Sequence, residues 1–214
     1  MSRNSFREVL SKYLPESSVD ICVSWIMQKN IHLTITKSRA SKYGDYRPLP
    51  DGKGHQITVN HDLNPYSFLI TFVHEVAHLQ TFIRYKHYHE PHGREWKNEF
   101  SALLSDFIHR GIFPDDVRSA LAGYIRNPAA SSCTDHDLQR TLKRYDQKTN
   151  DALHLEDLED GSLFTLHQSS GKLVFRKGHL LRKRFQCLEL NSRRIYFVSP
   201  LAEVVEIQPQ KNAN

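Results

Sequence analysis

The N-terminal part of the chain alternates between helical and strand-like hydrophobic patterns. Apolar residues recur at helical spacing over residues 6–13 and again over residues 19–27, with a proline in the break between them. β-branched residues alternate with others over Ile31–Thr36 and, more briefly, over residues 56–60. Two helices and two short strands are therefore predicted here, with turns over residues 38–51, where Gly and Pro recur.

A longer apolar pattern begins at Asn64. Asn is suited to cap a helix and Pro65 to occupy its first turn, so a helix is predicted from this point to about Tyr85. Its apolar positions form one stripe centred near Phe68 and Val76. This pattern predicts a helix with one buried face.

Three further helices are expected after it. One opens at His92-Gly93 and carries Trp96 on a narrow apolar face, and another starts at Pro114. A short polar helix contains Leu138 and Leu142. Five strands are then predicted over residues 162–167, 172–176, 180–190, 193–198 and 202–207.

These patterns predict an α+β protein with two parts. Residues 1–149 are expected to form a domain of helices packed on a small sheet, and residues 162–208 a small all-β module. Residues 150–161 are rich in carboxylates and lack basic residues, which is typical of a linker.

Composition narrows the class of protein. Of 214 residues, 39% are hydrophobic and 25% are charged, so the chain is expected to fold rather than remain disordered. The three cysteines are widely spaced and form no Cys-x-x-Cys pair, which argues against a disulfide framework or a cysteine zinc ribbon. Neither a signal sequence nor an apolar span is visible, so a cytoplasmic protein without membrane contact is expected.

The predicted helix after Asn64 contains the pattern His-Glu-x-x-His at His74, Glu75 and His78. Two histidines four residues apart project from the same side of a helix and can share one metal ion. The Glu between them can take a proton from a water that the metal activates. The pattern is short and the chain has 13 histidines, so a chance match is the alternative. Both histidines, however, fall opposite the apolar stripe, where they are expected to face a cleft or solvent.

Zinc requires a third protein ligand besides His74 and His78. Several residues downstream are candidates by their distance in sequence, namely His87, His89, His92, Glu95 and Glu99. His92 is favoured because it stands at the entrance of the next helix, where Trp96 anchors the chain.

HEVAH followed by HGREW resembles the SprT-like family of zinc metallopeptidases, which includes Spartan-related proteases. The turn region SKYGDYRP is also similar to the family's pattern, and the resemblance covers residues 31–107. It implies a minimal zincin-like domain, Zn²⁺ held by His74, His78 and His92, and Glu75 as the catalytic residue. It further implies a protein or peptide substrate, in particular proteins associated with or crosslinked to DNA.

The C-terminal module departs from the zinc ribbon that many SprT-like proteins carry, because it holds only Cys187. Between Gly171 and Phe197 it has eight basic residues, one acid and four aromatics, Phe175, Phe185, Tyr196 and Phe197. Such a surface would suit nucleic acid, and an ordinary β module is the alternative.

Two functions from different classes are therefore expected. The first is a zinc endopeptidase acting on DNA-associated or DNA-crosslinked proteins, with extended substrate along the edge of the strand over residues 56–60. The second is a nucleic-acid-binding protein whose zinc site is structural or vestigial and supports no proteolysis.

Overall fold

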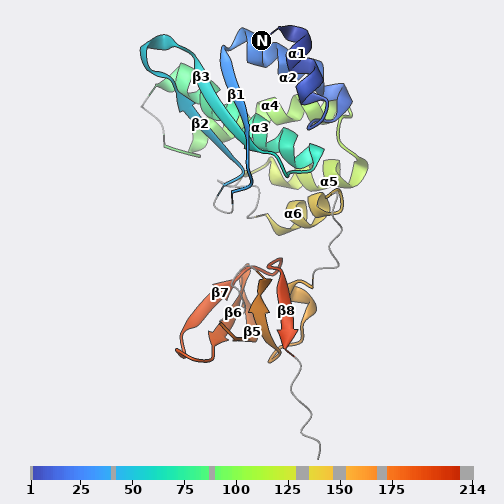
Figure 1. Cartoon of the computed structure of the whole chain (residues 1–214), viewed down its shortest axis with the longest axis vertical. Helices are drawn as coiled ribbons and strands as arrows, with labels where there is room; N and C mark the ends of the chain where they lie inside the picture. Colours follow the sequence, from blue (N-terminus) through green and yellow to red (C-terminus); the bar gives the residue numbers. More distant parts are fainter. Residues whose placement is uncertain are drawn as a thin grey trace, which may run out of the picture. The chain divides into compact units, whose positions relative to one another are not determined.

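The computed structural model describes residues 2–39, 42–86, 90–128, 135–146, 153–167 and 173–207. The chain divides into two compact units, Met1–Gln147 and Lys148–Asn214 (Figure 1). Within the described residues the first unit has six α-helices and a three-stranded sheet, and the second has a five-stranded sheet. The mixed α+β class predicted from the sequence is confirmed.

Polar side chains cap the N-termini of three helices of the first unit. The Asn64 side chain accepts the backbone N–H of Ser67 at 2.9 Å, and Pro65 fills the first helical position, as predicted. Asp135 caps the last helix through the N–H of Leu138. The helices are α1 (Arg3–Leu10), α2 (Glu16–Gln28), α3 (Pro65–Tyr85), α4 (Arg94–His109), α5 (Asp115–Tyr124) and α6 (His136–Lys143).

The sheet of the first unit has the order β1-β3-β2, formed by β1 (Ile31–Thr36), β2 (Gly44–Pro48) and β3 (His55–Asn60). β3 pairs in parallel with β1 and antiparallel with β2. A short 3-10 turn, η1 (Pro50–Gly52), joins β2 to β3. The expectation that substrate lies along the edge of β3 is wrong, because neighbouring strands occupy both of its edges. β1 and β2 are the edge strands.

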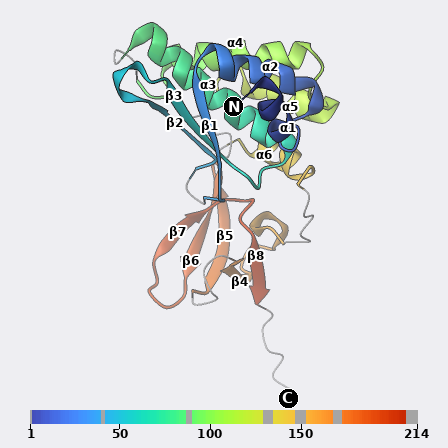
Figure 2. The ribbon, with the colours of Figure 1, turned by 45° about the horizontal axis from the view of Figure 1, so that its top comes forward.

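Helix α3 lies at the centre of the first unit. It packs against β2, β3 and α4, and Figure 2 shows the helices gathered on one side of the sheet. Residues 68–73 of α3 are all buried, so the single apolar stripe predicted from the sequence is too narrow. Ile83, which was expected on that stripe, is 45% exposed. The motif helix is thus enclosed by sheet and helices, which gives the side chains on it fixed surroundings.

The second unit is an antiparallel sheet in the order β7-β6-β5-β4-β8. Its strands are β4 (Leu163–Leu166), β5 (Phe175–Leu181), β6 (Arg184–Glu189), β7 (Ile195–Val198) and β8 (Val204–Ile207), with a 3-10 turn, η3 (Leu155–Asp157). The single strand predicted over residues 180–190 is wrong. Arg182 adopts a positive φ of 56° in a turn, and this turn divides the segment between β5 and β6.

The segment expected as an acidic linker belongs in part to the second unit. Leu155 and Leu158 are buried in its core, and His154 bridges to Glu203. The Leu155 N–H also donates to the carbonyl of Ala202 at 3.0 Å. Leu155 and Leu158 are thus buried, whereas Asp157, Glu159 and Asp160 beside them are exposed.

Two further observations concern the cysteine of the second unit and the lengths of the helices. Cys187 is a free, buried thiol in the core of the β module. Across the described part of the chain, none of the helices combines the length and apolarity needed to cross a bilayer.

Candidate metal centre

Helix α3 and the turn before α4 bring three imidazoles together. The Nε2 atom of His74 lies 3.1 Å from that of His92 and 3.2 Å from that of His78, and the His78–His92 distance is 3.0 Å. Among the described residues these three form a group whose ligand atoms are close enough to hold one metal ion. The two histidines of the motif and the residue favoured as third ligand therefore converge on one point.

The chemistry of this donor set fits a cation. Each neutral imidazole Nε2 is either a donor or an acceptor, so among three nitrogens at least two have the same role. The three Nε2 atoms lie 3.0–3.2 Å from one another, so at least one pair places two donors or two acceptors in contact, which is unfavourable. A cation that accepts all three lone pairs removes this conflict. Nitrogens about 2.0–2.1 Å from a tetrahedral Zn²⁺ lie about 3.3–3.4 Å apart, close to the observed spacing.

His92 has an unusual backbone conformation. His92 has a φ of 59°, in the left-handed region that costs a non-glycine residue about 1–2 kcal/mol. The following residue, Gly93, is the N-cap of α4, and its N–H donates to the Glu90 carbonyl at 2.9 Å. Strain of this kind persists where the surroundings demand it, which is common at functional sites.

Trp96 forms the floor under the three imidazoles. Its fully buried ring lies 4.6 Å from His74, 5.3 Å from His78 and 4.7 Å from His92, measured between ring centroids. Phe100 stacks beneath Trp96, with its ring 5.0 Å away and only 9° from parallel. An aromatic layer therefore supports the imidazoles and excludes water from one side of the site.

Burial favours the neutral form of the His74 and His92 imidazoles. Desolvation, assisted by the nearby His78 and His92, holds the pKa of His74 well below its usual value, and burial also lowers the pKa of His92. The expectation that His74 and His78 face a cleft or solvent is only partly right, because both are half-buried beside Trp96. Neutral imidazoles offer the free lone pairs that a metal needs.

Glu75, which follows His74 on α3, lies in a dry position against the start of strand β2. Its side chain is buried, and desolvation raises its pKa to about 8. The nearby Asp45 carboxylate adds to this rise, whereas Lys42 and Arg39 oppose it. A divalent cation at the imidazoles would lower the pKa of Glu75, since an opposite charge favours the ionised form.

Gly44 is a residue of this site that the sequence did not single out. A Cβ at Gly44 would lie 2.5 Å from Oε1 of Glu75 and 2.8 Å from Cγ2 of Thr71. The first residue of β2 must therefore be Gly for the strand to approach the carboxylate. The pattern over residues 38–51 predicts turns alone, and the SKYGDYRP similarity was the one signal that pointed here.

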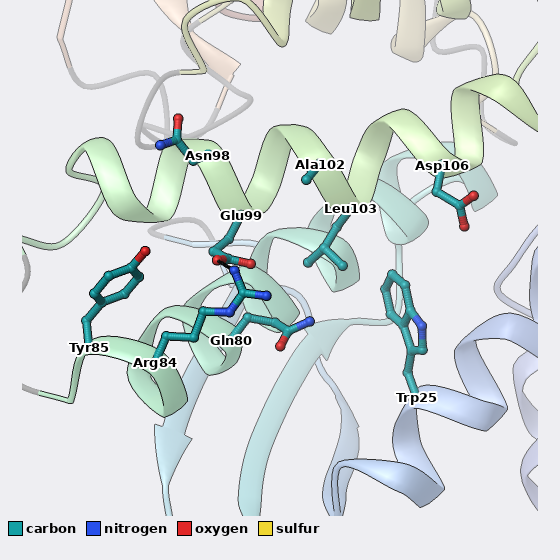
Figure 3. A pocket seen from close by; sticks show the side chains of 9 residues that line it. All are labelled: Trp25, Gln80, Arg84, Tyr85, Asn98, Glu99, Ala102, Leu103 and Asp106. Atoms are coloured by element: carbon teal, nitrogen blue, oxygen red, sulfur yellow. Dashed lines mark hydrogen bonds and ion pairs between the residues drawn. The ribbon is translucent and has the colours of Figure 1, made fainter.

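The other candidate ligands lie outside the imidazole group or outside the described residues. Glu99 forms an ion pair with Arg84 at the wall of a separate cavity of about 520 Å³, which Trp25 also lines (Figure 3). Within the described residues, neither Glu99 nor Glu95 belongs to the imidazole group. His87 and His89 fall in residues 87–89, outside the described residues.

Comparison with known proteins identified no relative of this chain. No family model, curated protein or solved structure matches the chain. The arrangement of His74, Glu75, His78 and His92 is therefore the structural feature that bears on function.

Proposed function

We propose that the protein is a zinc-dependent endopeptidase of the SprT-like type. The observation that carries the proposal is the convergence of three imidazole Nε2 atoms within 3.0–3.2 Å, with a buried carboxylate next to one of them in sequence. The resemblance of HEVAH and HGREW to SprT-like peptidases supports the same function, and with it a zincin-like fold for the first unit and DNA-associated proteins as substrates.

In this proposal His74, His78 and His92 hold the Zn²⁺ ion. When bound by these residues, the ion would act as a Lewis acid that could polarise a carbonyl oxygen and lower the pKa of a water molecule to about 7. Glu75 accepts a proton from the attacking water at a carboxylate oxygen and then delivers it to the leaving amine nitrogen. Trp96 and Phe100 keep bulk water away from the imidazoles. The products are a carboxylic acid and an amine, so one water is consumed for each bond cleaved.

The substrate is proposed to lie along β2. This strand is an edge of the sheet, it starts at Gly44 against Glu75, and its free backbone groups can pair with an extended peptide. A peptide paired with β2 would pass the Glu75 carboxylate. β3 could not bind a peptide in this way, because strands already occupy both of its edges.

The proposal is tested with zinc-loaded protein and an unfolded protein substrate. Glu75→Gln is expected to reduce turnover at least about 10³-fold while zinc content stays at one per chain, because the amide retains the shape but cannot accept the proton. His92→Ala is expected to lose zinc, whereas His179→Ala, an exposed histidine of the β module, should retain it. Cleavage by Glu75→Gln protein at the wild-type rate would reject the mechanism.

A second candidate function is nucleic-acid binding by the β module. Ile195 and Phe197 are 54% and 55% exposed on edge strand β7, beside exposed basic residues in the β5–β6 turn and before β7. Phe175 and Phe185, in contrast, are core residues, and the Tyr196 ring leans on Phe175 at 5.4 Å. Of the four aromatics singled out in the sequence, Phe197 is thus the one best placed to stack on a base.

Binding of single-stranded DNA to the whole protein tests this second function. Phe197→Ala is expected to weaken binding about fivefold to a hundredfold, the usual range for one stacked base. Val205→Ala, an equally exposed apolar residue on β8, is the matched control. If DNA binds but zinc-loaded wild-type protein cleaves no protein, the nucleic-acid function replaces the peptidase function.

A further inference from the structure

A second cavity, of about 590 Å³, has His92 in its lining. Its walls come from the start of α4 and from the chain just after α5. Three basic residues line it, Arg94, Lys97 and Arg126, against one acid, Glu90. The cavity therefore adjoins the imidazole cluster through a shared residue and carries a net positive charge.

Among the described residues, no ion pair neutralises these three basic side chains. Arg94 and Arg126 are exposed. Within the ranges that the structure describes, the arginines that form ion pairs are other ones, and neither Arg94 nor Arg126 is among them. Lys97 donates from Nζ to Oδ1 of Asn127 at 2.7 Å, and this amide carries no charge. Three cations are thus available to an anionic ligand.

We infer that this cavity is a specificity subsite that binds an acidic side chain of the peptide substrate. The inference rests on the proposed peptidase function and adds the class of substrate. An extended peptide advances about 3.3 Å per residue, so side chains close to a bond held at the imidazoles come within reach of a cavity lined by His92. A guanidinium can bind a carboxylate through two parallel hydrogen bonds, which gives such a subsite both affinity and orientation.

The shape of the cavity favours a side chain over a nucleic-acid backbone. Single-stranded nucleic acid is bound by a groove of basic residues that follows successive phosphates, with aromatic residues for the bases. Here the three cations line one hollow together with the apolar Ile125 and Pro128, rather than following a groove with aromatic residues. One compact carboxylate matches this lining.

Binding can be measured without turnover. Full-length Glu75→Gln protein, loaded with zinc, is titrated with fluorescent peptides that differ only in Glu or Gln at one position, and the position is scanned along the peptide. At one position the Glu peptide is expected to bind about tenfold more tightly, as for one charge-assisted pair. Raising the salt from about 0.05 to 0.5 M should remove most of this advantage because the charges are exposed.

The basic residues are then removed in the same protein. Arg94→Gln combined with Arg126→Gln is expected to abolish the preference for Glu, and each single change should reduce it. Arg118→Gln is the matched control, because Arg118 is an exposed arginine of α5 that does not line the cavity. Zinc content and the thermal midpoint of each variant establish that it is folded.

Each outcome bears on one proposal. Equal affinity for Glu and Gln peptides at every position, or a preference that survives the double substitution, overturns the subsite. Loss of single-stranded DNA binding in the double variant, with no preference among peptides, assigns the cavity to nucleic acid instead and also overturns it. Absence of cleavage by zinc-loaded wild-type protein, together with an Arg-dependent preference for Glu peptides, rejects the peptidase function but retains the acidic-ligand site.

Discussion

Gly44 and Glu75 are in such close contact that the first has no space for a side chain. The methyl carbon of an alanine at position 44 would lie 2.5 Å from a carboxylate oxygen and 2.9 Å from Cγ of Glu75. Strand β2 and helix α3 therefore fix the proposed general base between them, and the position of its proton-accepting oxygen depends on the absence of a Cβ.

Gly44→Ala is accordingly expected to reduce peptidase turnover about tenfold to a hundredfold, since small displacements of a catalytic group are costly. Zinc content should be unchanged, because the substitution leaves the three proposed ligands, His74, His78 and His92, in place. Gly123→Ala serves as the control, as an added Cβ there meets nothing within 4 Å and alanine favours the helix. Full activity in Gly44→Ala would contradict the positioning role.

Glu75→Gln is expected to stabilise the metal-free protein at neutral pH. The pKa of Glu75 is raised to about 8 in the folded state from 4.5, so between these values folding requires a proton and stability falls as pH rises. An amide carries no such requirement, and the gain at pH 7 should be on the order of 3 kcal/mol. Chemical denaturation of chelator-treated protein at pH 5 and pH 8 measures it. A gain no larger at pH 8 than at pH 5 would contradict the argument.

Acid should release the metal and weaken the first unit. The pKa of His74 is held well below its usual value in the folded state, mainly by burial, so the unfolded chain takes up protons first as the pH falls. Stability contributed by the neutral imidazole is therefore present above about pH 6.5 and is lost below it. Thermal midpoints of zinc-loaded protein should fall between about pH 7 and 5, together with zinc content. A zinc occupancy that is constant over this range would contradict a three-histidine site.

Leu155→Ala is expected to destabilise the β module by about 2–4 kcal/mol, because a fully buried leucine leaves a cavity. Leu153→Ala, at a position 37% exposed, should cost much less. Tryptophan is absent from the second unit, so amide hydrogen exchange in residues 163–207 is the appropriate measurement. Equal effects of the two substitutions would place Leu155 outside the core.

Much of the fold follows from local patterns. Asn64-Pro65 predicts the start of α3, Ile31–Thr36 predicts β1, and the spacing of His74 and His78 places both on one side of a helix, because each of these depends only on neighbours in sequence.

The remaining features depend on contacts distant in sequence. The central position of β3 arises from pairing with strands on both sides, and the need for Gly44 arises from a side chain 31 residues further along the chain. Leu155 and Leu158 lie in a segment whose composition predicts a linker because carboxylates dominate it, whereas burial is decided by the sheet that the two leucines contact.

The indole of Trp96 would serve as a built-in optical probe of metal binding at the proposed site. The chain has two tryptophans, and the other, Trp25, packs on Phe107 at 5.3 Å. In a Trp25→Phe protein all indole emission would come from the ring that touches the three imidazoles, so a paramagnetic ion such as Co²⁺ would quench it and Zn²⁺ would displace that ion and restore the signal. Metal affinity and exchange rates could then be followed in the intact protein without labels, substrates or turnover.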